Sequence, residues 1–543
     1  MGRARAGGTG ITAGRGDQAE GADGASPGGA WRRRLADPYV VVSAVLVLVT
    51  AAVSVRRPWV GDFGLHAGTV EQLKARLWHP LDPMVGVPAR SPYFTPYTVM
   101  LGLLARIFGL AGSTVLAIAA PAGVALVAIG LHRFVRTLSA ARWAPLLALA
   151  AVLLVWGTFP LAWSGFLSLF GLPLMGAYPS TVATGLTLLW FSGIARHVAS
   201  DTEPETLRAA GYGLGGAVIA LIHPFSGVIA MIGAAALLAR PLVRSGGRAR
   251  LPAIAVALAV AVVVAIATLA VWPYYSFFAL ARAGGLDAVH RPLYEHMLTQ
   301  FGLAIVTLPA LWLRWRRDRL DPLVLFAVAC ALGVAAGAGT GHYALVRLLP
   351  GALLAGQIGL GIEIARALSS GRERVSDRLR TAPLTAAALA IVAVVAMVGA
   401  WRQAGNLLLG LPPAVASRFP FWIQQADPDL AWVRAHAEAG DVVVTDRSEF
   451  ARVLPAYGLF TVAPAWPDPA VPDSPQRSAD QAILLDPATG PATVAELLAR
   501  YRVRWLLLPA GSVGPPGPWP ATLVDRDTAG DELFRVDPRS ASK

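Results

Sequence analysis

The stretch PYVVVSAVLVLVTAAVSVRRPWVGDFGLHAG, residues 38–68, contains the first hydrophobic segment of the chain and the start of its first polar loop. Residues 38–55 are mostly apolar, and 18 residues of α-helix are long enough to cross the hydrocarbon core of a bilayer. Asp62 and His66 follow a few residues after this run. The sequence therefore predicts a membrane-spanning helix followed by a carboxylate and an imidazole at the membrane surface.

Composition extends this prediction to the whole chain. Of the 543 residues, 55% are hydrophobic and only 15% are charged, so the excess apolar residues must face lipid. The net charge of +13 does not indicate nucleic-acid binding, because the arginines form short clusters without interleaved aromatic residues. The single cysteine, Cys330, lies in an apolar run, which excludes a disulfide within the chain and a cysteine metal site. We expect a polytopic α-helical membrane protein that is embedded in the lipid bilayer.

Eleven apolar runs are candidates for membrane-spanning helices. The runs lie near residues 38–55, 112–132, 143–160, 179–195, 209–222, 225–239, 251–272, 298–313, 322–339, 345–365 and 382–400. If the N-terminus is cytoplasmic, the later cytoplasmic loops carry eighteen arginines and the short opposing loops only three. Such an excess is typical of the cytoplasmic side. This count predicts a multi-pass plasma-membrane protein with a cytoplasmic N-terminus and an extracytoplasmic C-terminus.

The same count assigns the doubtful segment 95–109. If this segment crossed the membrane, the arginine-rich loops would all lie outside, so we interpret it as a helix lying in the outer interface, with Arg106 extended toward the headgroups. The predicted domains are a disordered cytoplasmic tail at 1–36, a membrane domain at 37–400 whose large first outer loop spans 56–113, and a soluble extracytoplasmic domain at 401–543.

The soluble domain shows alternating strand and helix patterns. Residues 441–446 and 504–509 read as buried strands, and 493–501 read as an amphipathic helix. Thr493 and Glu496 have the spacing of a capping box at the start of that helix. These patterns predict a small α/β domain. Because it contains no glycine-rich phosphate loop, we do not expect nucleotide binding.

The first outer loop holds the predicted catalytic residues. Asp62 and His66 are four residues apart and would share one face of a helix. The pair can take a proton from a hydroxyl or help to hold a divalent cation, which is the one cofactor that the sequence allows. The alternative is an ordinary solvated carboxylate near a helix end. Asp82 is a second carboxylate that can assist, although Leu81-Asp82-Pro83 is also a common turn sequence.

Predicted substrate-binding residues lie where later apolar runs reach the outer side. His223 stands between two runs, and it marks either a wet cavity or a capped helix end. Arg347 opens the tenth run, where it can pair with a lipid phosphate or extend toward the headgroups. His342 and Tyr343 precede it and are either binding residues or interfacial anchors.

The segments GDFGLHAGTVEQL and SPYFTPYTVMLGLLARIFG, with the apolar runs around them, resemble the GT-C superfamily of glycosyltransferases that use polyprenyl-phosphate sugars. That superfamily includes protein O-mannosyltransferases, lipid A aminoarabinose transferases and actinobacterial arabinofuranosyl- and mannosyltransferases. The resemblance covers about the first 140 residues by motif and the rest by topology. This chain has a single acidic residue, Asp62, where many members have two.

The resemblance implies an inverting transfer of a sugar from a polyprenyl phosphate donor to a hydroxyl of an envelope glycan, lipid or protein on the outer face. Asp62 would be the general base, and Arg347 would bind the lipid phosphate. His66, Asp82 and His223 would orient the acceptor or a cation. Two other classes fit the same span count, namely a lipid or polysaccharide transporter and a non-catalytic envelope assembly protein.

Overall fold

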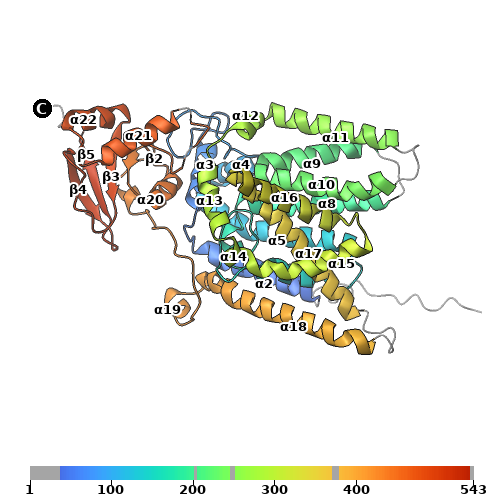
Figure 1. Cartoon of the computed structure of the whole chain (residues 1–543). Coiled ribbons are helices and arrows are strands. Elements are labelled where there is room, and N and C mark those ends of the chain that lie inside the picture. Colours follow the sequence, from blue (N-terminus) through green and yellow to red (C-terminus); the bar gives the residue numbers. More distant parts are fainter. Residues whose placement is uncertain are drawn as a thin grey trace, which may run out of the picture. The chain divides into compact units, whose positions relative to one another are not determined.

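Figure 1 shows the computed structural model of the chain, in which residues 37–200, 205–244, 251–369, 378–466, 468–471 and 473–537 are described. The chain divides into two compact units, residues 1–42 and 43–543. Of the first unit, only residues 37–42, at the start of helix α2, are among the described residues. The features below belong to the second unit. The predicted cytoplasmic tail, residues 1–36, lies outside the described residues.

Long apolar helices make up most of the second unit. Within the described ranges, eight helices are long and apolar enough to cross a membrane. They are α2 (Pro38–Val55), α5 (Gly112–Leu138), α10 (Pro224–Arg244), α11 (Leu251–Val271), the consecutive α14 (Met297–Phe301), η1 (Gly302–Thr307) and α15 (Leu308–Arg317), α16 (Pro322–Thr340), η2 (Tyr343–Leu348) with α17 (Leu349–Ser369), and α18 (Arg378–Gln403). The other three predicted runs coincide with α6 (Ala144–Leu154), α8 (Pro179–Ala199) and α9 (Thr206–Ile222). The predicted polytopic helical architecture is therefore confirmed.

Two predicted spans are interrupted near the site described below. The run predicted to continue to residue 160 leaves the helix after Leu154, where the side-chain amide of Gln357 donates a hydrogen bond of 2.7 Å to the carbonyl of Val155. The run predicted to begin near residue 345 opens as the 3₁₀ turn η2, which contains Arg347. Non-helical backbone inside a membrane needs such partners, since lipid offers no hydrogen bonds. An apolar sequence carries no signal for either interruption.

The first outer loop contains two helices, α3 (Phe63–Ala75) and α4 (Pro96–Phe108). Thr95 and Thr98 cap α4 reciprocally, because each side-chain oxygen accepts a hydrogen bond from the backbone N–H of the other residue. Gly109 ends α4 in the left-handed conformation that favours glycine. The helix predicted at 95–109 is thus confirmed. It exposes an apolar face, as a helix in the membrane interface would, consisting of Met100, Leu103, Leu104, Ile107 and Phe108.

A five-stranded mixed sheet forms the C-terminal domain, in the order β2-β1-β3-β5-β4. The strands are β1 (Val442–Val444), β2 (Phe460–Thr461), β3 (Val503–Leu508), β4 (Ala521–Arg526) and β5 (Glu532–Val536). Strand β1 runs parallel to β2 and β3, whereas β5 is antiparallel to β3 and β4. The strands predicted at 441–446 and 504–509 are β1 and β3.

Helices α20 (Ser448–Val453), α21 (Ser474–Leu485) and α22 (Pro491–Arg500) accompany the sheet. The helix predicted at 493–501 is α22, but the predicted capping box is wrong. The helix begins two residues earlier, with Gly490 as its N-cap and Pro491 in its first turn, so Thr493 already lies inside it. Proline is favoured in the first turn, since its fixed φ suits a helix and its missing N–H costs nothing there.

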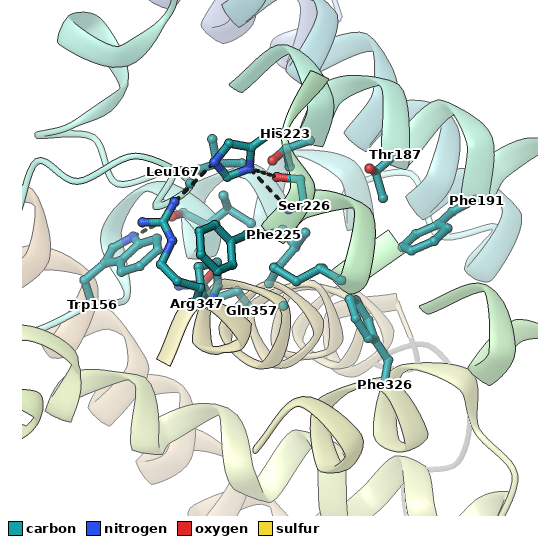
Figure 2. A pocket seen from close by; sticks show the side chains of 17 residues that line it. Trp156, Leu167, Thr187, Phe191, His223, Phe225, Ser226, Phe326, Arg347 and Gln357 are labelled. Atoms are coloured by element: carbon teal, nitrogen blue, oxygen red, sulfur yellow. Dashed lines mark hydrogen bonds between the residues drawn. The ribbon is translucent and has the colours of Figure 1, made fainter. Parts of the chain in front are cut away.

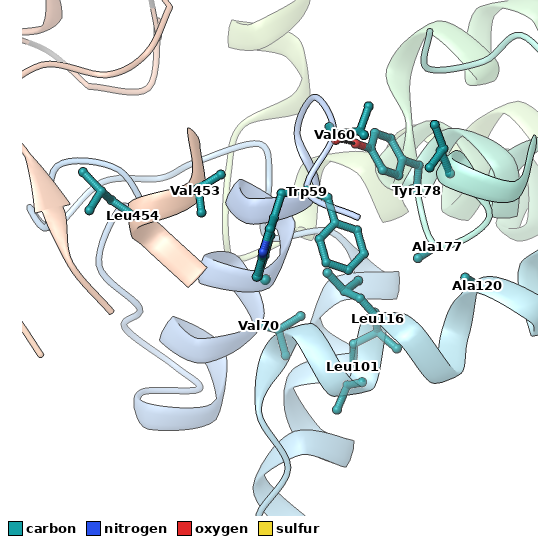
Figure 3. Close-up of a cluster of buried hydrophobic side chains, with 14 of the residues drawn as sticks. Trp59, Val60, Val70, Leu101, Leu116, Ala120, Ala177, Tyr178, Val453 and Leu454 are labelled. Carbon is teal, nitrogen blue, oxygen red and sulfur yellow. Dashed lines mark hydrogen bonds between the residues drawn. The ribbon is translucent and has the colours of Figure 1, made fainter. Parts of the chain in front are cut away.

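Glycines let the C-terminal domain contact the first outer loop backbone to backbone. A Cβ at Gly64 would collide with the carbonyl oxygen of Arg452, and a Cβ at Gly68 would lie 2.5 Å from Cβ of Pro455. The N–H of Thr461 also donates a hydrogen bond of 2.7 Å to the carbonyl of Met84. Figure 3 shows the shared hydrophobic cluster, to which the first loop contributes Trp59, Val60 and Val70 and the C-terminal domain contributes Val453 and Leu454.

We expect Gly68→Ala to destabilise this contact by about 1–3 kcal/mol, the usual cost of overpacking a close-packed interface. The variant should lower the thermal unfolding temperature of the purified protein and speed trypsin cleavage between the membrane and C-terminal domains. Gly211→Ala is the matched control, because a Cβ there meets open space on helix α9. Equal stability of the two variants would contradict the close contact.

Candidate functional site

A pocket between the membrane helices combines a polar end with apolar walls (Figure 2). The polar end is formed by Arg347 and His223, which point toward each other in Figure 2. Helices α6, α8, α10, α16 and α17 contribute the walls, and the apolar lining includes Phe191, Ile229, Phe326 and Leu354. The pocket places a positive charge next to apolar walls, and its free volume is about 30 Å³, roughly that of one water molecule.

Arg347 supplies the positive charge at the polar end. Its side chain is buried, with 5% of the residue exposed, and its guanidinium lies over the ring of Phe225 with the central carbon 4.9 Å from the ring centre. The Nε atom is buried without a hydrogen-bond partner. Across the described residues, no salt bridge joins Arg347 to a carboxylate. The guanidinium therefore keeps a donor and a charge for an anion.

His223 connects Arg347 to helix α10. Its Nε2 lies 3.3 Å from Nη2 of Arg347, and its Nδ1 lies 2.9 Å from Oγ of Ser226. The backbone N–H of Ser226 also donates a hydrogen bond of 3.2 Å to Nδ1. Both ring nitrogens thus face hydrogen-bond donors, which a doubly protonated ring could not accept. His223 is therefore neutral and holds Arg347 in place. His223 ends α9 at a helix break and also lines the pocket, while its role in substrate binding stays a prediction.

Asp62 is half-buried at the N-terminus of helix α3. Its carboxylate makes no capping hydrogen bond to the helix. Burial raises the pKa of Asp62 to about 6, against the opposing effects of the positive charges of Arg452 and Arg347, while the negative charge of Asp427 raises it further. Asp62 does not line the pocket that holds Arg347 and His223, although its charge interacts electrostatically with Arg347.

His66 lies on the first turn of the helix that Asp62 caps, and its role in orienting the acceptor or a cation stays a prediction. It is buried, and its ring meets Tyr178 and Tyr93 edge to face, at centroid distances of 4.9 and 5.8 Å. Burial lowers the pKa of His66 to about 4, so the imidazole is neutral at physiological pH. The buried Nδ1 has no hydrogen-bond partner. His66 thus forms an uncharged wall of the site.

Asp82 serves the turn that its sequence indicated. One carboxylate oxygen accepts hydrogen bonds from the N–H groups of Met84 and Val85 at 2.9 and 3.0 Å. Burial raises the pKa of Asp82 to about 6, and the nearby negative charge of Asp468 contributes. Asp62 is not among the groups that shift this pKa, although both carboxylates interact with Tyr93. A catalytic role for Asp82 stays a prediction, and its hydrogen bonds indicate a structural one.

His342 and Tyr343 lie at the start of η2 but do not line the pocket. Tyr343 meets Tyr294 edge to face at 5.5 Å and carries the guanidinium of Arg291 over its ring, while His342 is exposed. The turn of η2 separates these residues from Arg347. Their contacts fit the anchoring alternative better than the binding role predicted for them.

The described residues contain no group of three or more His, Cys, Asp and Glu side chains arranged to hold a metal ion. Asp427 is the carboxylate whose negative charge raises the pKa of Asp62, and it already forms an ion pair with Arg452. The divalent cation stays a prediction, and the chemistry proposed below does not use one.

No protein-family model matches the chain, and no curated protein sequence matches it. Solved structures do. ArnT from Cupriavidus metallidurans, bound to undecaprenyl phosphate, aligns with 92% of this chain and 98% of its own at 14% identity and a TM-score of 0.53. The arabinofuranosyltransferase AftD from Mycobacteria aligns at 14% identity and a TM-score of 0.54, over 93% of this chain and 40% of its own.

The chain has the GT-C fold. At this level of identity the likeness establishes the fold alone, and the chemistry must be argued from the side chains. Three further residues lie near the side chains described above, and of them the sequence indicated only His290, as part of a polar loop that could cover a pocket. His290 is buried against Phe225, and Asp427 and Arg452 form an ion pair of 3.3 Å near Asp62. Arg452 belongs to the short helix α20, and no motif marks it.

Asp62 should become protonated with a midpoint near pH 6, because its surroundings disfavour the charged form. Labelling with a hydrophobic carbodiimide, which reacts with protonated carboxyl groups, should therefore modify Asp62 increasingly as the pH falls through 6, as measured by peptide mass spectrometry. Asp525 is the control, since a hydrogen bond from His436 lowers its pKa. A midpoint for Asp62 at the ordinary value of 3.8 would contradict the assignment.

Proposed function

We propose that the protein is an integral membrane glycosyltransferase that transfers a sugar from a polyprenyl phosphate to a hydroxyl group in the cell envelope, on the extracytoplasmic face. The observation that carries this proposal is the buried guanidinium of Arg347, which forms no salt bridge with a carboxylate among the described residues and stands at the end of an apolar pocket. Its charge also acts on Asp62. A buried charge without a salt-bridge partner in contact with it is costly, so its retention favours an anionic ligand at that place.

The phosphate of the donor would bind at Arg347. The Nε–H without a partner and the remaining Nη hydrogens can bind two phosphate oxygens in a forked geometry. His223 keeps the guanidinium in position from one side and Phe225 from the face. The solved ArnT structure, whose whole length this chain nearly covers, contains undecaprenyl phosphate, a ligand of this chemistry.

The apolar part of the pocket would take the first isoprene units of the donor. Phe191, Ile229 and Phe326 line it away from Arg347, and Figure 2 shows Phe191 and Phe326 at the end opposite the guanidinium. Contact between the hydrocarbon chain and these side chains would contribute binding free energy, because it removes apolar surface from water. A transporter would instead need a continuous path across the membrane. The pocket is a single site with a charged group at one end, which fits the binding of a donor better.

Asp62 would act as the general base. Its carboxylate removes the proton from the acceptor hydroxyl while that oxygen attacks the anomeric carbon of the sugar from the face opposite the phosphate. The bond between the anomeric carbon and the phosphate oxygen breaks, and the electron pair leaves with the polyprenyl phosphate. Arg347 stabilises the negative charge that develops on this leaving group. The products are the inverted glycoside and the free lipid phosphate, with the proton on Asp62.

Substitutions at the two charged residues test the proposal. In vesicles supplied with a polyprenyl-phosphate sugar, we expect Asp62→Asn to reduce kcat by about 100-fold or more, because the base is lost. Arg347→Gln should lower both undecaprenyl phosphate binding and kcat. Arg291→Gln is the matched control, since Arg291 is exposed on α13 (Asp287–Glu295) and pairs with Glu295. Sugar transfer at the wild-type rate by the folded Asp62→Asn protein would refute the assignment of the base.

The pH dependence gives a second test. A base must be ionised, so kcat/KM should fall about tenfold per pH unit below the pKa of Asp62, which burial raises to about 6. The neutral histidines His66 and His290 should add no limb between pH 5 and 8, because burial lowers the pKa of each to about 4. Full activity at pH 5 would exclude Asp62 as the group that takes the proton.

A further inference from the structure

Arg452 brings a charge from the C-terminal domain to the first outer loop. It lies on α20, whose backbone packs against Gly64, two residues after Asp62 at the start of α3. Its Nη2 forms an ion pair of 3.3 Å with Asp427, and its Nε is buried without a partner. Asp427 in turn is fixed by its N–H, which donates a hydrogen bond of 2.5 Å to the carbonyl of Trp59.

Two guanidinium groups and two carboxylates therefore meet at this place. Asp62 interacts electrostatically with Arg452, Arg347 and Asp427, in decreasing order. The other groups that face it are uncharged, namely the phenols of Tyr178 and Tyr93 and the imidazole of His66. With Asp62 ionised, the four charges balance.

Binding of the donor disturbs this balance. The phosphate binds to Arg347, so the positive charge of Arg347 is then shared between the phosphate and the carboxylate of Asp62. A second negative charge also approaches the base, which favours its protonation. Without another cation, the base would lose its charge in the complex that needs it.

We propose that Arg452 is a positioning residue of the active site, supplied by the C-terminal domain, which keeps Asp62 ionised while Arg347 holds the donor phosphate. This inference rests on the proposed function and adds to it a role for the outer domain, because contact of α20 with α3 becomes a condition for an active base. Separation of the domain from the first loop would inactivate the enzyme without loss of donor binding.

The test is carbodiimide labelling of Asp62 in the full-length protein, measured against pH with and without undecaprenyl phosphate. We expect Arg452→Gln to raise the labelling midpoint by about one pH unit or more, since a nearby opposite charge lowers a carboxyl pKa by about 1–3 units. Undecaprenyl phosphate should widen the difference from wild type. Arg452→Lys should restore most of the wild-type midpoint, and Asp427→Asn should lower it, because a negative charge is removed.

Arg526→Gln is the matched control. Arg526 lies on the exposed strand β4 and pairs with Glu532 on the neighbouring strand β5. Its midpoint should equal that of wild type. A merely structural role for Arg452 would lower the unfolding temperature but leave the midpoint of the folded protein unchanged, and that result would overturn the inference. If Arg452→Gln does not fold, the Asp427→Asn protein decides the question, because an unchanged labelling midpoint in that variant would also contradict the inference.

Labelling requires no turnover, so this inference can fail independently of the proposed function. Activity in Asp62→Asn would remove the base, whatever the labelling midpoints are. Inactivity in Asp62→Asn together with an unchanged midpoint in Arg452→Gln would leave the glycosyltransferase assignment standing and remove Arg452 from its site.

Discussion

The electrostatic balance around Asp62 is the constraint on which the rest of the site depends. A carboxylate in surroundings that exclude water tends to take up a proton, and Arg452 and Arg347 oppose that tendency. One guanidinium comes from a 3₁₀ turn at the start of a membrane helix and the other from the C-terminal domain. The proposed base therefore depends on three segments that are distant in the sequence.

The architecture follows from the sequence wherever one local pattern dominates. Apolar runs of sufficient length predicted the membrane helices, and the arginine distribution assigned the segment around α4 to the membrane surface instead of a span. Buried strands β1 and β3 were predicted from continuous runs such as DVVV and RWLLL. Strand β4 was not, because it is mostly exposed and its residues lack a hydrophobic alternation. Elements that bury apolar side chains can thus be predicted from the sequence, whereas an edge strand that buries few of them cannot.

The site was predictable only in part. Asp62, His223 and Arg347 each stood out as polar residues beside apolar runs, where their charge or hydrogen bonds needed an explanation. Position alone did not separate Arg347 from His342 and Tyr343, because the direction of each side chain depends on the 3₁₀ turn between them. Arg452 carried no signal, since an arginine in a short soluble helix is ordinary. Its significance arises from the contact with Gly64, nearly four hundred residues earlier.

That contact also explains why glycine stands at residues 64 and 68 of a helix, where it lowers helix stability relative to alanine. Bare backbone on this face allows α20 and the following turn η6 (Leu454–Tyr457) to approach α3 more closely than side chains would permit. Charge interactions weaken with distance and with intervening water, so close approach strengthens the effect of Arg452 on Asp62. The helix gives up local stability at two residues, and in return the outer domain lies close enough for its charge to act on the carboxylate at the start of that helix.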